Sequence, residues 1–218
     1  MNVLKPFLLT LLLIVGIGSY AQDETFSPKG AVSVDVGIPT LAENFAFRRT
    51  MTGLFNGGIG YQHNLFKGLT LGAGAKFSFF TINPSTVPAG WTGGIYIPAV
   101  YGRLGYEKFT TERVSMAAWC KAGYAAMMGV GDSCKIKNGG PFVEGAFFFE
   151  PQLEVCLLTE KGGANGFSFI LGYNFVFSNF RPDYLCVDGI TNLSGEDYEG
   201  ITRFLSIGFG YRYYLGRN

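Results

Sequence analysis

Charge and histidine are scarce in this chain. Only 15% of its 218 residues are charged, against the usual quarter or so of a globular domain, and histidine occurs once. The formal net charge is +1 and like charges do not gather into runs, so the composition gives no reason to expect binding to nucleic acid or to an anionic surface. The GxGxxG and P-loop patterns are missing as well, which removes the common nucleotide-binding motifs.

Long apolar runs are also missing, apart from a short one near the N-terminus. The stretch 7–17, FLLTLLLIVGI, is too short to cross roughly 30 Å of hydrocarbon as a helix. Lys5 precedes it and SYA (19–21) follows it with small residues, as in a signal peptide, and no cysteine follows that would carry a lipid anchor. We therefore expect a signal peptide over 1–21 and an exported domain over 22–218.

Glycine and aromatic residues, in contrast, are abundant, with 32 Gly, 21 Phe and 12 Tyr. In GFSFILGYNFVFSNF (166–180), apolar or aromatic residues take every second position from Phe167 to Phe177, and mostly small or polar residues lie between them. A period of two indicates a β-strand with one apolar face. The same alternation occurs in eight segments, which are 30–38, 53–62, 69–81, 95–107, 113–127, 142–157, 166–178 and 202–215.

The connections between these segments alternate in length. The short ones contain turn residues and span 63–68, 108–112 and 159–166, and the long ones span 39–52, 82–94, 128–141 and 179–201. An even number of strands with alternating short and long connections is typical of bacterial outer-membrane barrels. We therefore expect an all-β fold, an eight-stranded antiparallel up-and-down transmembrane β-barrel over 22–218. Both termini and the short turns would then lie in the periplasm, and the long loops outside the cell.

The second face of the strands distinguishes a barrel from a soluble sandwich. It is rich in glycine, at Gly58, Gly60, Gly72, Gly74, Gly105, Gly123, Gly145, Gly172, Gly208 and Gly210. Glycine weakens a strand in water, but inside a narrow barrel it leaves space for long side chains to cross the lumen. The same face carries charges of both signs, which we expect to form a lumen charge network that fills the interior: Asp35, Lys76, Arg103, Lys121, Glu144, Glu150, Glu154 and Arg212.

The alternative is a secreted soluble β-sandwich that binds a ligand and carries these charges on a solvated face. In the barrel, the aromatic face from Phe167 to Phe177 would contact lipid. Tyr and Trp residues near strand ends would form interfacial girdles, and the candidates are Tyr61, Trp91, Tyr106 and Tyr213.

With these features the chain resembles the small eight-stranded outer-membrane barrels of the OmpA/OmpX type. Within that type it looks closer to the Bacteroidota "outer membrane protein beta-barrel domain" group, often labelled PorT-like. The resemblance covers 22–218 and rests on SYAQ (19–22), on hairpins such as GGIGYQHNLFKGLTLGAGAKF (57–77) and on the closing FLSIGFGYRYYLG (204–216). It implies a location in the outer membrane and, for the PorT-like group, a partner in the type IX secretion apparatus. One departure is that such barrels end on an aromatic residue, whereas LGRN follows Tyr214 here.

The sequence offers little for catalysis. Barrel enzymes such as the omptin proteases and the lipid A acyltransferases resemble this chain in architecture but rely on rim histidines, and His63 falls in a predicted periplasmic turn. Glu150 and Glu154 share a strand face, as in the carboxylate pairs of glycosidases, but a polysaccharide cannot enter an eight-stranded barrel. We therefore expect no enzymatic activity, and the spacing of potential ligands suggests no cofactor or metal site.

The four cysteines are expected in an oxidising compartment. Cys134 and Cys186 fall in the third and fourth long loops, on the same side of the membrane, and we expect a disulfide between them. Cys120 and Cys156 lie on neighbouring strands, but on different faces unless a bulge near Pro151 shifts one of them.

Function is then expected in the loops. Aromatic residues beside arginine suit contact with a protein, and the candidate contact residues are Phe45, Phe47, Arg48, Arg49, Tyr184 and Tyr198. The leading hypothesis is a monomeric, non-enzymatic barrel that acts as a structural or interaction protein in the cell envelope. The alternative is a narrow channel for water, ions or a small solute, which would need an unbroken polar path through the lumen.

Overall fold

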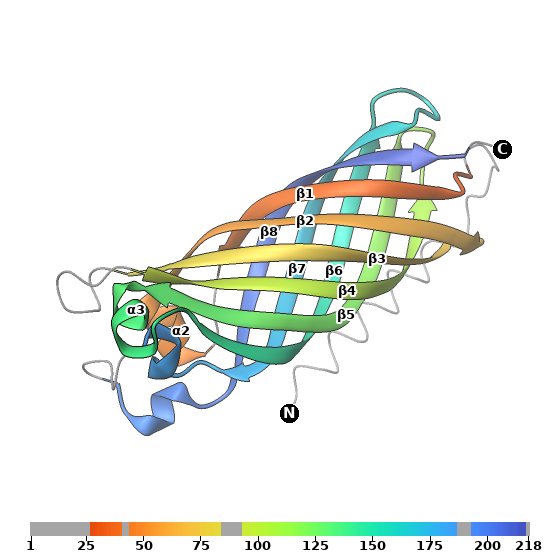
Figure 1. Cartoon of the computed structure of the whole chain (residues 1–218). Helices are drawn as coiled ribbons and strands as arrows, with labels where there is room; N and C mark the ends of the chain where they lie inside the picture. Colours follow the sequence, from red (N-terminus) through yellow and green to blue (C-terminus); the bar gives the residue numbers. More distant parts are fainter. Residues whose placement is uncertain (1–26, 41–43, 84–92, 187–192, 217–218) are drawn as a thin grey trace.

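A single closed sheet of eight antiparallel strands makes up most of the molecule. The computed structural model describes residues 27–40, 44–83, 93–186 and 193–216, so the signal peptide expected over 1–21 lies outside the described residues. Each strand pairs with its neighbours in the chain, and the first pairs with the last (Figure 1). The strands are β1 (Gly30–Thr40), β2 (Met51–Phe66), β3 (Leu69–Ile82), β4 (Gly93–Phe109), β5 (Val114–Gly131), β6 (Phe142–Leu158), β7 (Asn165–Asn179) and β8 (Ile201–Leu215). The predicted barrel is confirmed, and the two-sheet sandwich is wrong.

The strands are longer than the sequence pattern indicated, most clearly at the turn between β2 and β3. We expected a connection over 63–68, but β2 continues to Phe66 and the turn consists of Lys67 and Gly68. Both turn residues have positive φ, 45° at Lys67 and 86° at Gly68. Tight two-residue hairpins require this conformation because it matches the twist of the flanking strands, and glycine adopts it without strain.

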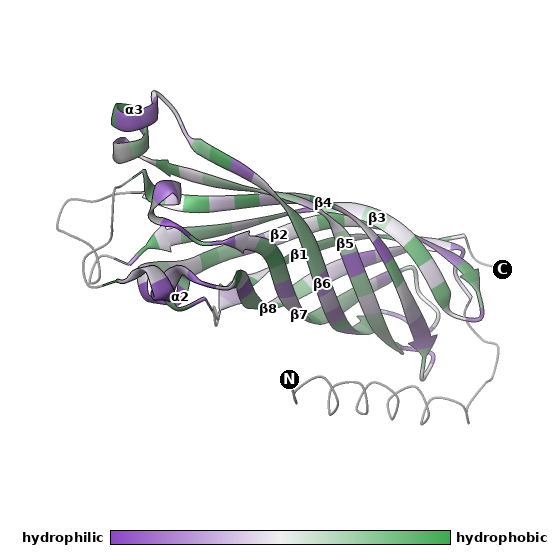
Figure 2. Ribbon diagram, turned by 90° about the horizontal axis from the view of Figure 1, so that it is seen from below, coloured by the Kyte–Doolittle hydropathy of each residue, from purple (hydrophilic) through white to green (hydrophobic). Residues whose placement is uncertain are grey.

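Side chains alternate between the outside of the barrel and its lumen. On β7, Phe167, Phe169 and Phe177 are exposed on the outside, whereas Ser168 and Asn174 are buried in the lumen. The hydropathy colouring shows this alternation along the strands (Figure 2). The inward and outward faces were therefore assigned correctly for this strand.

One glycine was assigned to the wrong face. Gly145 of β6 alternates with the lumen residue Ala146 and is itself exposed on the outside. The position that a Cβ would take at Gly145 is occupied by the hydroxyl group of Tyr124 on β5. Gly145 therefore makes room for an outer tyrosine and not for a lumen side chain.

Short helices gather at the end of the barrel that carries the long connections (Figure 1). They are α2 (Phe45–Thr50), α3 (Asp132–Asn138) and the 3-10 turns η2 (Pro182–Leu185) and η3 (Gly195–Tyr198). We call this end the loop end and the opposite one, with the short turns, the turn end. The sequence pattern had not indicated these helices. Within the described ranges, no helix is long and apolar enough to cross a bilayer.

Glycines in the lumen lie beneath long side chains, as expected for a narrow barrel. A Cβ added to Gly172 would overlap the carboxylate of Glu150, and one added to Gly105 would lie within 2.9 Å of Cδ2 in the Trp119 ring. Since the ring of Trp119 is almost fully buried, it has little room to move away. The barrel interior is therefore filled by pairing a large side chain on one strand with a glycine on the next.

This packing predicts different effects for two glycines of β4. Gly105→Ala should destabilise the folded barrel by about 1–3 kcal/mol, because the new methyl group overlaps a rigid buried ring. Gly102→Ala is the matched control, since it points outward and its Cβ would meet no atom closer than 3.9 Å. Urea unfolding of the refolded barrel, followed by its shift in gel mobility, measures both. Equal stability of the two variants would contradict this account of the lumen.

Candidate functional site

The lumen is filled in three layers. Nearest the turn end is a group that we call the arginine cluster, which consists of Arg212, Arg103, Glu107, Glu154, Gln62, Trp119, Ser115 and Tyr214. Next comes the lysine cluster, which consists of Lys76, Lys121, Glu150, Asn174 and Asp35. The loop-end plug is the third layer and contains Phe47, Phe180, Tyr184 and Leu185 from the loops.

Arg212 is the centre of the arginine cluster. Its side chain on β8 has no exposed surface and lies between carboxylates from β4 and β6. Nη1 donates to Oε1 of Glu107 at 2.6 Å, and Nη2 donates to Oε2 of Glu154. A guanidinium group presents its donors in a fixed fork, so one arginine holds three strands at a set spacing.

Glu107 also accepts hydrogen bonds from side chains on three other strands. Tyr214 and Ser115 donate to its Oε1 at 2.6 Å and 2.9 Å, and Gln62 donates to its Oε2 at 2.7 Å. The side-chain oxygen of Gln62 accepts in turn from Nη2 of Arg103 at 2.8 Å. Arg103 is therefore joined to the carboxylates through the amide of Gln62 and not by a direct ion pair.

Trp119 links the two arginines of this cluster. The guanidinium carbons of Arg103 and Arg212 lie 4.8 Å and 5.6 Å from its ring, a range in which the ring face attracts a cation. Its indole nitrogen donates to Oε2 of Glu154 at 3.2 Å. Trp119 thus contacts both cations of the cluster and one of its carboxylates.

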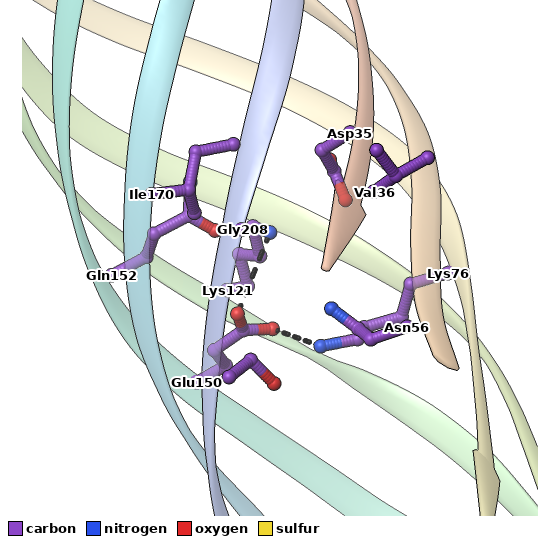
Figure 3. A pocket seen from close by; sticks show the side chains of 10 residues that line it. Asp35, Val36, Asn56, Lys76, Lys121, Glu150, Gln152, Ile170 and Gly208 are labelled. Carbon is purple, nitrogen blue, oxygen red and sulfur yellow. Dashed lines mark hydrogen bonds and ion pairs between the residues drawn. The ribbon is translucent and has the colours of Figure 1, made fainter. Parts of the chain in front are cut away.

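Glu150 is the centre of the lysine cluster. Its Oε2 accepts from Nζ of Lys76 at 2.7 Å, and its Oε1 lies 3.7 Å from Nζ of Lys121. Lys76 also donates to the side-chain oxygen of Asn174 at 2.6 Å, and Asn174 donates to Ser206 at 2.9 Å. Figure 3 shows Glu150 between the two lysines, with Asp35 of β1 across the cavity from them.

The charges of the two clusters balance. Among the described lumen residues, the cations are Lys76, Lys121, Arg103 and Arg212, and the carboxylates are Asp35, Glu150, Glu107 and Glu154. Each cluster contains two of either sign. Since an uncompensated charge in a dry interior is costly, this balance keeps the polar filling compatible with a stable barrel.

The structure brings together seven of the eight side chains that we expected in the lumen network, and the exception is Glu144. This residue lies near the start of β6, at the loop end, and is partly exposed. Its Oε2 accepts from Nη2 of Arg181 at 2.5 Å and its Oε1 from Ser178 at 3.0 Å. Glu144 has the same strand parity as Glu150 but lies nearer the loop end, where the apolar plug fills the barrel. Its carboxylate therefore pairs with Arg181, which lies in a loop, and not with a lumen cation.

Glu107 and Gln62 were missed as members of the network. Both lie on the inward face, since Glu107 has the same parity as Gly105 and Arg103 on β4, and Gln62 the same parity as Gly60 on β2. Extending the period of two to the strand ends would have included them. Both stand at the very end of the segments predicted as strands.

The loop-end plug is apolar. Phe47 of α2 packs edge-on against Phe80 of β3 and against Phe180, with ring centroids 4.8 Å and 5.3 Å apart. Tyr184 of η2 lies against Phe180, and its hydroxyl group is 2.5 Å from the hydroxyl of Ser178. Residues from two different long loops thus enter the mouth of the barrel and close it.

Two of the predicted contact residues belong to this plug and are not available to a partner. Phe47 and Tyr184 are completely buried, so their assignment as surface contacts is wrong. The remaining candidates lie on the surface: Phe45, Arg48 and Arg49 are exposed on α2, and Tyr198 of η3 is half-buried. The short helix α2 explains the difference, because it places Phe45 and Phe47 on different faces.

Asn44 fixes α2 to the opposite loop. Its side-chain oxygen accepts from the backbone N–H of Phe47 at 3.0 Å, which caps the helix, and its amide nitrogen donates to the carbonyl of Gly200 at 2.9 Å. In η3, hydrogen bonds from Ser194 lower the pKa of the Asp197 carboxyl, and the charge of Arg49 acts in the same direction. The first and last long loops therefore hold each other in place.

A disulfide joins Cys134 of α3 to Cys186, directly after η2, with the two Cα atoms 4.9 Å apart. It links the third and fourth long loops, where the sequence suggested a bridge. Cys120 and Cys156 are free: one is exposed outside and the other is buried in the lumen. The pairing of β5 with β6 runs without a register shift through Pro151, so the two thiols stay on opposite faces.

The residues weighed for catalysis lie apart from the loop end. His63 is exposed on the outside of β2, close to the turn end. Glu150 and Glu154 are buried in different clusters, each held by its own cations. Over the ranges that the structure describes, no group of three or more His, Cys, Asp or Glu side chains is placed to hold a metal ion.

Comparison with known proteins identifies the fold. No protein-family model matches the chain, and no curated protein matches it. Among solved structures the chain is similar to Neisserial surface protein A (NspA), with a TM-score of 0.51 and 9% identity over 86% of this chain and 97% of that one. It also matches a major outer membrane protein from Thermus thermophilus, with a TM-score of 0.49 and 13% identity over 84% of this chain and 99% of that one. The likeness to NspA supports the eight-stranded barrel fold.

The lysine cluster predicts a clear difference between two glutamates of β6. Glu150→Gln should destabilise the barrel by about 3–5 kcal/mol, because it leaves two buried lysines without a full counter-charge. Glu144→Gln removes a partly exposed pair and should cost less than about 1 kcal/mol. Urea unfolding followed by tryptophan fluorescence compares the two. A loss at Glu144 as large as that at Glu150 would mean that the network extends to the loop end.

Proposed function

We propose that the chain is an integral outer-membrane barrel with a closed lumen, whose function is to present a fixed loop-end surface to a partner. The outer face supports the membrane location. Large apolar residues are exposed on every strand, among them Val34, Ile59, Leu71, Val100, Tyr124, Phe147, Phe169 and Phe209. A soluble monomer rarely exposes a continuous apolar belt of this kind, whereas a barrel in lipid requires it.

The proposed orientation puts the turn end in the periplasm and the loop end outside the cell, as in outer-membrane barrels generally. Tyr61, Tyr106 and Tyr213 are exposed on the outside near the turn end, which fits an aromatic girdle at the inner interface. Trp91 lies outside the described residues. Export would depend on the signal peptide expected over 1–21.

The filled lumen is the observation that carries the proposal. A channel needs an unbroken polar path, but ion pairs cross the lumen in both clusters and the plug closes the loop end. The cavity beside the lysine cluster has a volume of about 10 Å³, room for about one water molecule. We therefore favour an interaction role over transport and over catalysis.

The exposed face of α2 is the best candidate contact surface. Arg48 and Arg49 both lie close to the exposed ring of Phe45, with guanidinium carbons 5.8 Å and 6.0 Å from its centroid. The buried face of the same helix is held by Phe47 and Asn44. Because the helix is anchored, binding through these three side chains costs little ordering of the loop. The PorT-like resemblance makes a type IX secretion component one candidate partner.

The closed lumen predicts the absence of conductance. The purified protein, inserted into a planar bilayer in concentrated KCl, should give no stable current steps above the baseline, because the paired charges and the plug leave no path for ions. A porin of sixteen strands recorded in the same bilayer is the positive control. Reproducible unitary steps from the purified barrel would instead support the channel alternative.

The contact surface predicts a charge-dependent partner. Tagged protein should be extracted from native outer membranes in mild detergent and captured with whatever co-purifies. The double variant Arg48→Glu, Arg49→Glu should reduce recovery of a stoichiometric partner by roughly tenfold or more, the loss typical of truncating interface anchors. The matched control is Lys135→Glu, Lys137→Glu, which reverses two exposed charges on α3. A solitary barrel in every case would overturn the interaction role, and loss only with the α3 variant would move the contact surface to α3.

A further inference from the structure

Three buried or half-buried polar groups, two from the lysine cluster and a third from Gln152 of β6, face one cavity without a direct hydrogen-bond partner. The polar lining of this cavity consists of Asp35, Lys121, Gln152, Asn56, Ser206, Lys76 and Glu150. Lys76 donates to Glu150, while Asn56 and Ser206 accept from Ser78 and Asn174. Lys121 and Gln152 are 3% and 4% exposed, so the solvent outside the barrel does not hydrate them.

Lys121 has an ion pair but no direct hydrogen bond. Its Nζ lies 3.7 Å from Oε1 of Glu150, beyond the range of an N–H···O bond. The Nζ atom also lies 4.9 Å from the centroid of the Tyr101 ring. Within the part of the chain that the structure describes, an ammonium group with three donors is thus left without an acceptor at bonding distance, which is costly for a buried charge.

Asp35 and Gln152 supply the complementary groups. Asp35 projects from β1 toward the cavity, and Gln152 projects from β6 beside Lys121 (Figure 3). Within the described residues, the side chains of Asp35 and Gln152 form no hydrogen bond with another side chain or with the backbone. Asp35 and Lys121 line the same cavity, so the two opposite charges belong to one electrostatic unit although they do not touch.

The size of the cavity limits what can join these groups. Its volume of about 10 Å³ is close to the minimum for a single water molecule, and a buried water usually has two to four polar partners. Water both donates and accepts, so one molecule can accept from the ammonium group and donate to the carboxylate. A halide would accept from Lys121 but would face the negative charge of Asp35.

We propose that this cavity is a binding site for one ordered water molecule, which accepts a hydrogen bond from Lys121 and donates to Asp35, with Gln152 as its third partner. The water completes the lysine cluster as a closed, neutral unit. It extends the pairing of charges across the lumen from β5 and β6 to β1, where the barrel closes. The proposal concerns the lumen alone and does not depend on the contact surface on α2.

A crystal structure of the refolded full-length domain, grown with bromide as the only halide, tests the site. We expect an electron-density peak within hydrogen-bond distance of Asp35, Lys121 and Gln152, without anomalous signal from bromine. An anomalous peak would mean an anion site, and a direct ion pair between Asp35 and Lys121 across a collapsed cavity would mean that no ligand is bound. Either of these results overturns the proposal.

Variants give a second test with a matched control. Asp35→Leu should remove the peak, because its side chain fills the cavity and offers no acceptor, whereas Asp35→Asn keeps an acceptor and should keep the water. Ser33→Ala, on the same face of β1 but outside the cavity, should leave the peak unchanged. If Asp35→Leu does not refold, Gln152→Leu serves the same purpose, and a peak that persists in both Leu variants contradicts the assigned partners.

Stability measurements in solution provide an independent readout. In a double-mutant cycle, Asp35→Leu and Gln152→Leu should be coupled by about fivefold in the unfolding equilibrium constant, because each removes a partner of the same water. Asp35→Leu and Gln62→Leu, which lies in the arginine cluster, should show no coupling. Equal coupling in both pairs would point to a general effect of repacking the lumen and not to a shared water.

Discussion

The width of an eight-stranded barrel is the constraint on which the rest of this structure depends. Such a barrel has an interior just wide enough to be filled by side chains, so each inward residue must fit its neighbours in volume and in charge. Gly105 accommodates Trp119, and Gly172 accommodates Glu150. The charges follow the same constraint, because Arg212 has no exposed surface and is neutralised by Glu107 and Glu154 inside the lumen. A closed lumen is therefore a consequence of strand number and composition together.

Two kinds of filling meet inside this barrel, and they contribute in different ways. The polar clusters connect strands that are not neighbours, as Arg212 of β8 does with β4 and β6. Pairs of this kind are weak evidence for net stability, but they specify one arrangement because any shift leaves a charge unpaired. The plug of Phe47, Phe180 and Tyr184 is apolar and is made by loop residues. It converts two loops into part of the core, and the disulfide from Cys134 to Cys186 joins a third loop to them.

The strands and their inward faces were predictable because a period of two is a local property of the sequence. Phe167 to Phe177, Lys76 and Arg212 all follow it. The errors occur where distant parts of the chain meet. Glu144 has the parity of Glu150 but lies at the level of the plug, and Phe47 and Tyr184 look like loop residues until α2 and η2 fold into the barrel mouth. Parity does not reveal depth along the barrel axis, and local sequence does not reveal that a loop turns inward.

A likeness to NspA at 9% identity follows from the same physics. The barrel fold requires that apolar residues alternate with small or polar residues on each strand and that tight turns join the strands at one end. Very many sequences meet both conditions. Inside the lumen the fold requires only that the side chains together fill the available volume and that their charges neutralise each other. The group of Arg212, Glu107 and Glu154 is one of many ways to meet this requirement. Two proteins can therefore share this fold although their sequence identity is very low. The exposed side chains of α2 are under neither condition, since Arg48 and Arg49 lie on the surface beside the ring of Phe45 and, among the described residues, form no ion pair with a lumen carboxylate. The fold therefore leaves these two positions open to change.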